Sequence, residues 1–142
     1  MNQISFKFDM SPAEATAYEA CKWVKDNRRD FKLLMCVFHN NVNQGVSCTK
    51  RGELEHWARF HGITPSNDEA FQFDHNLYAA LTRYMVMLMP RLARTINFRK
   101  SALDDVDLAS IWYEVVDSRT AFLADNRYMA QHLVDIDDAC AR

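Results

Sequence analysis

The sequence is poor in glycine and has no long apolar run, and each absence excludes a class of protein. Its three glycines, Gly45, Gly52 and Gly62, are too few and too scattered for a glycine-rich loop that cradles phosphate groups. No unbroken apolar run is longer than six residues, the length of the run at 84–89, whereas a membrane-spanning helix needs about 20. No apolar stretch of signal-peptide length stands near the N-terminus. We therefore expect no membrane span and a cytoplasmic location.

The cysteines and histidines lack the spacing of a metal site. The chain has four cysteines without a Cys-x-x-Cys pair: Cys21, Cys36, Cys48 and Cys140. In a chain without an export signal, such cysteines are expected to be reduced and mostly buried. Cys36 and His39 are followed by Cys48, His56 and His61, but a structural zinc needs four ligands in a tetrahedron. Because His56 and His61 point to different faces of a helix, we predict no metal site, and no cofactor is indicated.

Charge is nearly balanced in total but unevenly distributed along the chain. With 17 basic and 19 acidic residues, the net charge of −2 produces no strong field for nucleic acid or an anionic membrane. Residues 75–103 contain no acid and five basic residues, whereas residues 104–142 contain nine acids and three arginines. Either the two stretches face each other or solvate separate surfaces, or one of them meets an oppositely charged macromolecule. The sequence leaves both interpretations open.

Length and periodicity predict one mainly helical domain. A chain of 142 residues, of which 49% are hydrophobic and 25% charged, has the size and composition of a single globular domain covering residues 1–142. Ile4, Phe6 and Phe8 alternate with polar residues, which predicts a short N-terminal extended segment. Elsewhere the apolar spacing favours a bundle of five to six helices. The expected helices cover approximately residues 12–27, 31–40, 50–60, 76–89, 105–123 and 125–139.

The expected helix 76–89 is apolar on both sides. Leu81 and Met85 belong to one face, while Val86 and Met87 cover the other. A helix that is apolar all round is normally central in a bundle, and Pro90 is expected to end it. Its second face must be covered, and a second copy of the chain or a target protein would do this.

A partial helix-turn-helix pattern occurs over residues 49–64. After a cap at Thr49, Ala58 is the small residue of a first helix, Gly62 the turn glycine and Ile63 the apolar residue that follows. A looser variant places the second helix at residue 76. This helix contains Arg83 and is followed directly by the basic residues of 91–100, which could contact phosphates. The outer face of that helix carries mainly valine and methionine, which do not read base edges. The alternative is two packed helices separated by a glycine stop.

No set of catalytic residues stands out, so we predict a non-enzymatic protein. Cys36 near His39 lacks an orienting third group, and the acids at 104–107 are explained by helix capping. The favoured hypothesis is a small regulatory protein, an adaptor or inhibitor, that binds a protein partner. The alternative is a helix-turn-helix-like DNA-binding transcriptional regulator using residues 49–100, and a homo-oligomer is a further option. The predicted binding residues are basic: Arg51, Arg59, Arg83, Arg91, Arg94, Arg99 and Lys100.

Overall fold

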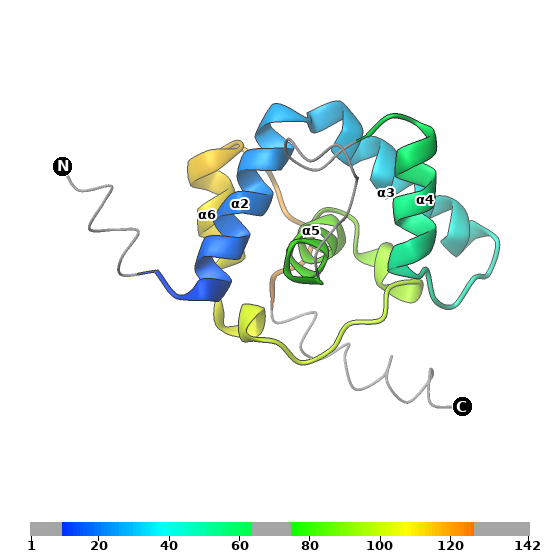
Figure 1. The fold of residues 1–142 in the computed structure, drawn as a ribbon. Coiled ribbons are helices and arrows are strands. Elements are labelled where there is room, and N and C mark those ends of the chain that lie inside the picture. Colours follow the sequence, from blue (N-terminus) through cyan, green and yellow to red (C-terminus); the bar gives the residue numbers. More distant parts are fainter. Residues whose placement is uncertain (1–9, 64–74, 127–142) are drawn as a thin grey trace.

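A computed structural model describes residues 10–63 and 75–126 of the chain. This part is mainly helical and forms a compact bundle without strands (Figure 1), which confirms the predicted fold class. The predicted N-terminal extended segment lies outside the described residues, as does the predicted helix 125–139 beyond residue 126. The elements are α2 (Pro12–Asp26), α3 (Arg28–Asn43), α4 (Arg51–Phe60), α5 (His75–Leu88), the 3-10 helices η1 (Pro90–Arg94) and η2 (Ala102–Asp105), and α6 (Leu108–Val115).

Local capping residues set the start of α2, which begins at Pro12 as the predicted range 12–27 has it. The Ser11 hydroxyl accepts a hydrogen bond from the Glu14 amide at 3.1 Å, and the Glu14 carboxylate accepts one from the Ser11 amide at 3.2 Å. This reciprocal capping box, with Pro12 in the first helical position, satisfies two amides that a helix N-terminus leaves unpaired. Asn27 separates α2 from α3, since its side chain donates to the carbonyl of Trp23 at 2.9 Å. The break expected at residues 28–30 is therefore limited to Asn27, because α3 begins at Arg28.

Helix α5 is the centre of the bundle. In Figure 1 it is seen end-on, with α2 and α6 on one side and α3 and α4 on the other. All residues from Ala80 to Met87 are buried. The Tyr84 hydroxyl donates to the carbonyl of Leu108 at 2.9 Å, and the amide of Leu123 donates to the carbonyl of Met87 at 2.9 Å. The central position is confirmed.

The second face of α5 is covered by the chain itself. Val86 and Met87, which the sequence assigns to that face, are both fully buried in the single chain. The segment that follows α6 passes along α5 near Met87, and η1 packs back against it. The expectation that a second copy or a target must cover this face is therefore wrong.

Two predicted helix ends are wrong for the same reason. Thr49 does not cap α4, which begins after Lys50, because the Thr49 hydroxyl is buried against the Thr95 hydroxyl at 2.6 Å. Helix α6 ends at Val115 instead of continuing to residue 123, because Trp112 Nε1 donates to the Thr120 hydroxyl at 2.8 Å and the following chain pairs with α5. Contacts with distant segments replace the local helical arrangement in both places. The predicted stop at Gly62 is confirmed, with φ at +70°.

Candidate partner-binding groove

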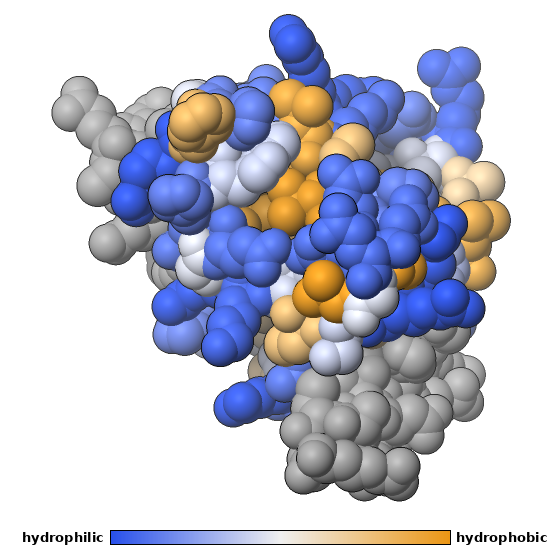
Figure 2. All heavy atoms as spheres, turned by 90° about the vertical axis from the view of Figure 1, so that its right-hand side faces the viewer, coloured by the Kyte–Doolittle hydropathy of each residue, from blue (hydrophilic) through white to orange (hydrophobic). Residues whose placement is uncertain are grey.

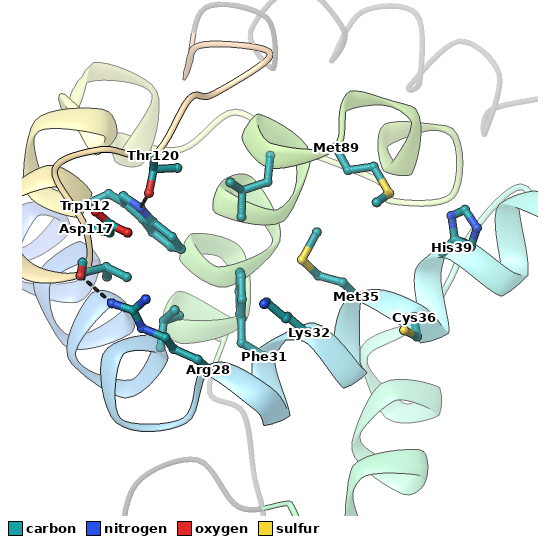
Figure 3. Close-up of a pocket in the computed structure, with 13 residues that line it drawn as sticks. Arg28, Phe31, Lys32, Met35, Cys36, His39, Met89, Trp112, Asp117 and Thr120 are labelled. Carbon is teal, nitrogen blue, oxygen red and sulfur yellow. Dashed lines mark hydrogen bonds between the residues drawn. The ribbon is translucent and has the colours of Figure 1, made fainter.

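An apolar groove of about 530 Å³ opens between α3, the end of α5 and the chain after α6. Figure 3 shows Phe31 and Met35 around its middle, Arg28 and Asp117 toward one end, and Cys36, His39 and Met89 toward the other. The groove is also lined by Leu88 at the end of α5 and by Trp112 and Val116 from the opposite wall. Its interior is therefore built by side chains from three separate parts of the chain.

Helix α3 supplies both the floor and one lip of the groove. Phe31 is buried and Met35 half-buried, and their spacing of four residues puts them on one side of the helix. Arg28, Lys32 and Cys36 repeat with the same spacing and are exposed. Because α3 packs its remaining apolar residues into the core, these two rows stay beside each other at the edge of the bundle.

The opposite wall is held by an aromatic cluster around Trp112. Its ring centroid lies 5.9 Å from that of Phe31, 5.2 Å from that of Tyr84 and 5.5 Å from that of Phe122. Such pairs add to the stability that burial supplies. With the indole N–H bonded to Thr120, the ring has a fixed orientation. The wall of the groove is therefore formed before anything binds.

Charged side chains stand at the edges of the groove. The Arg28 guanidinium donates to the carbonyl of Val116 at 2.6 Å and joins α3 to the opposite wall. Lys32 is exposed one helical turn further along α3. On the opposite wall, Asp117 Oδ1 accepts from the Arg119 amide at 2.9 Å and lies 3.9 Å from Arg119 Nε. The α3 lip is therefore positive, while Asp117, the acid among the described residues that line the groove, already has a basic neighbour.

Arg83 was predicted to meet a partner, and the structure corrects this assignment. Its side chain is 1% exposed, and Nη1 lies 2.7 Å from Asp104 Oδ1. Nη2 donates to the carbonyl of Arg99 at 3.1 Å, and the guanidinium lies over the ring of Phe98. Burial lowers the pKa of Arg83, and the neighbouring Asp104 carboxylate opposes that shift. Arg83 therefore holds the fold together and is not offered to the surface.

The other predicted binding residues belong to η1, α4 and the segment after η1 and do not line the groove. Arg91 donates to Asn43 Oδ1 at 2.8 Å, and Arg51 lies 3.6 Å from Glu55 in the next turn of α4. The exposed cations in this group are Arg59, Arg91, Arg94, Arg99 and Lys100. Figure 2 shows the face on the side of α3 and α4, where apolar surface lies between mostly hydrophilic side chains. None of the seven predicted residues lines the groove.

The sequence reasoning missed the residues that do line the groove. The signal on α3 was present, because Phe31 and Met35 form one row and Arg28 and Lys32 a neighbouring row. A stripe of this kind is usually core packing. The opposite wall comes from residues 112–120, and nothing in the local pattern of either segment indicates that they meet.

The looser helix-turn-helix variant is wrong because α5 cannot serve as a recognition helix. Such a helix must lie with its outer face in the DNA groove, whereas residues Ala80 to Met87 are all buried. The tighter variant would place its second helix directly after Ile63, in residues 64–74, which lie outside the described part of the chain.

The basic stretch 75–103 and the acidic stretch 104–142 meet in the Arg83–Asp104 pair, which is the one ion pair between them in the described ranges.

Comparison with known protein families, characterised proteins and solved structures finds no match to this chain. Within residues 10–63 and 75–126, no group of three or more His, Cys, Asp or Glu side chains is arranged to hold a metal ion. Among the helices in the same ranges, none combines the length and the apolar character that a membrane crossing requires.

Proposed function

We propose that this protein is a small non-enzymatic regulator that acts by binding a protein partner in the groove between α3 and the chain after α6. The observation that carries the proposal is an apolar groove with exposed charged residues along its lip. Exposed apolar surface edged by polar residues is typical of interaction sites, and a groove between helices suits a helical segment of a partner. The proposal includes a cytoplasmic location, and a second copy of the chain is one partner it allows.

The open side of the groove favours a macromolecular partner. Arg28, Lys32 and Cys36 line the groove and are nevertheless exposed to solvent, so an occupant would keep one side in contact with water. Small-molecule sites bury most of the ligand surface. The methionines Met35 and Met89 also suit a protein surface, because their flexible side chains adapt to a partner's shape.

Affinity purification with mass spectrometry tests this proposal, with and without nuclease treatment. Cys36→Trp fills the mouth of the groove from an exposed position, and Lys22→Trp places the same residue at an exposed site on α2 that does not line it. We expect a protein that is recovered with the wild type and with Lys22→Trp, is lost with Cys36→Trp, and binds directly when purified. If everything recovered with the wild type is also recovered with Cys36→Trp, the groove is not the binding site.

DNA binding is a second candidate, favoured by the exposed cations near η1. Arg94, Arg99 and Lys100 belong to a stretch without acids, and all three are exposed. Such residues are suited to phosphate contacts, which are strongly salt-dependent. With α5 buried, binding through this surface would depend on the DNA backbone. The test is binding of duplex DNA at low salt to the wild type and to a variant combining Arg94→Ala with Arg99→Ala. Equal or absent binding would remove this candidate.

A further inference from the structure

We infer that the occupant of the groove is an acidic amphipathic helix of the partner protein. This inference rests on the proposed function and adds the chemistry of the partner. It follows from two parallel rows on α3, an apolar row of Phe31 and Met35 and a basic row of Arg28 and Lys32. A helix with apolar residues on one face and acidic residues along the neighbouring edge complements both rows.

The spacing of the two rows fits a helix. Phe31 and Met35 are four residues apart, as are Arg28 and Lys32, and four residues correspond to a rise of about 6 Å along an α-helix. Apolar side chains at positions i, i+4 of a partner helix repeat at the same distance. Acidic residues with the same spacing on its edge would lie opposite both cations.

The charges around the groove favour acidic residues on that edge. Arg28 is held by its hydrogen bond to the carbonyl of Val116, so its positive charge has a fixed position. Lys32 takes part in no ion pair within the described part of the chain. Asp117, on the far wall, accepts a hydrogen bond from the Arg119 amide and lies near the Arg119 side chain. A basic helix would therefore face two cations at the α3 lip, whereas an acidic helix would meet complementary charge there.

The test is a display selection of helical peptides on the full-length protein. The library keeps leucine or phenylalanine at positions i, i+3, i+4 and i+7 and varies the other positions between glutamate and lysine. Selected peptides and their charge-reversed counterparts are then synthesised, and their binding is measured by fluorescence anisotropy. A synthetic peptide of residues 125–142, which is acidic and amphipathic in sequence, is tested as a competitor.

Four protein forms separate the inference from the proposed function: the wild type, Lys32→Glu, Lys22→Glu and Cys36→Trp. We expect glutamate-rich peptides to be selected and to bind the wild type at least about fivefold more tightly than their lysine counterparts. Lys32→Glu should weaken binding of the acidic peptide about three- to tenfold. Lys22 is exposed and does not line the groove, so Lys22→Glu should change binding less than about twofold. Cys36→Trp should abolish binding.

Each other result overturns the inference in a distinguishable way. If acidic and basic peptides bind equally and both are lost with Cys36→Trp, the groove binds helices without regard to charge, and the proposed function stands. Competition by the 125–142 peptide at equal affinity would identify this chain, in the same or a second copy, as the occupant. If no peptide binds the wild type better than Cys36→Trp, the occupant is not a helix, and the proposed function is judged by affinity purification alone.

Discussion

Arg83 of α5 and Asp104 of η2 form an ion pair inside the protein, with Nη1 and Oδ1 separated by 2.7 Å. Each partner also binds the backbone, because Arg83 donates to the carbonyl of Arg99 and Asp104 accepts from the amide of Ser101 at 3.0 Å. The pair therefore fastens the segment after η1 to the central helix. Asp104, from the acidic stretch, therefore compensates the buried positive charge of Arg83.

Removing one member of this pair should destabilise the protein strongly. Asp104→Ala leaves the buried guanidinium of Arg83 without its counter-charge, and losing one partner of a buried pair costs about 3–5 kcal/mol. Replacing both residues by apolar ones, in Arg83→Met with Asp104→Leu, should restore much of this loss. Urea unfolding of the wild type, of Asp104→Ala and of the variant combining Arg83→Met with Asp104→Leu measures these free energies. A free energy of unfolding for Asp104→Ala within about 1 kcal/mol of the wild type would show that the pair contributes little.

The protein should lose stability above pH 9 because of Cys21. Burial raises the pKa of this thiol from 9.0 to about 12, and a hydrogen bond with Tyr84 acts in the opposite direction. Above pH 9 the thiol ionises in the unfolded chain but stays protonated in the folded protein, so the unfolded state is favoured as the pH rises. The loss is at most about 1.4 kcal/mol per pH unit and continues up to the folded pKa.

Cys21→Ala should remove this contribution to the pH dependence. The measurement is urea unfolding at several values between pH 8 and pH 10 under reducing conditions. The upper end of this window reaches the ordinary value of Tyr18, whose pKa is raised from 10.0 to about 12 by burial and by its hydrogen bond to Glu114, and the comparison with Cys21→Ala separates the contribution of the thiol. If the wild type and Cys21→Ala lose stability with the same slope, the alkaline sensitivity has another origin.

Two glycines should respond in opposite directions to the same substitution. Gly62 ends α4 with φ at +70°, and a Cβ there would contact nothing within 4 Å, so Gly62→Ala carries only the strain of a left-handed backbone, about 1–2 kcal/mol. Gly52 lies in the first turn of α4 without positive φ and also has open space around it. Gly52→Ala should stabilise the helix by up to about 1 kcal/mol. Thermal unfolding of both variants decides this, and a stabilising Gly62→Ala would contradict the description of the turn.

The buried threonine pair should behave as one unit. Thr49 and Thr95 share a hydrogen bond at 2.6 Å, and Asn41 Nδ2 donates to the Thr49 hydroxyl at 2.8 Å. Thr49→Val leaves the Thr95 hydroxyl buried without this partner, at a cost of about 1–3 kcal/mol. The double variant, Thr49→Val with Thr95→Val, leaves neither hydroxyl unpaired. Its loss of unfolding free energy should therefore be smaller than the sum of the losses of the two single variants. A double-mutant cycle of unfolding free energies measures the coupling, and strict additivity would show that the two hydroxyls act independently.

Features that depend on neighbouring residues could be predicted from the sequence. Ser11, Pro12 and Glu14 form a capping box within four residues, and Gly62 supplies the left-handed turn at the end of α4. Helix ends that depend on distant partners could not be predicted from the sequence. Thr49 has the residue type of a helix cap, but it pairs with Thr95, and the segment after α6 leaves the helical path to pair with Met87.

By itself, the spacing of apolar residues determined that this protein is a helical bundle and that α5 is its centre, because a helix with two apolar faces is stable only when both are buried. The tertiary structure decided what covers the second face of α5, where the charge of Arg83 is used and where a groove opens. Each of these depends on segments that are far apart in the chain, and hydrophobic burial has no direction of its own that would specify which segments meet. The packing of α3 against residues 112–120 is therefore what turns an ordinary amphipathic helix into one wall of a candidate binding site.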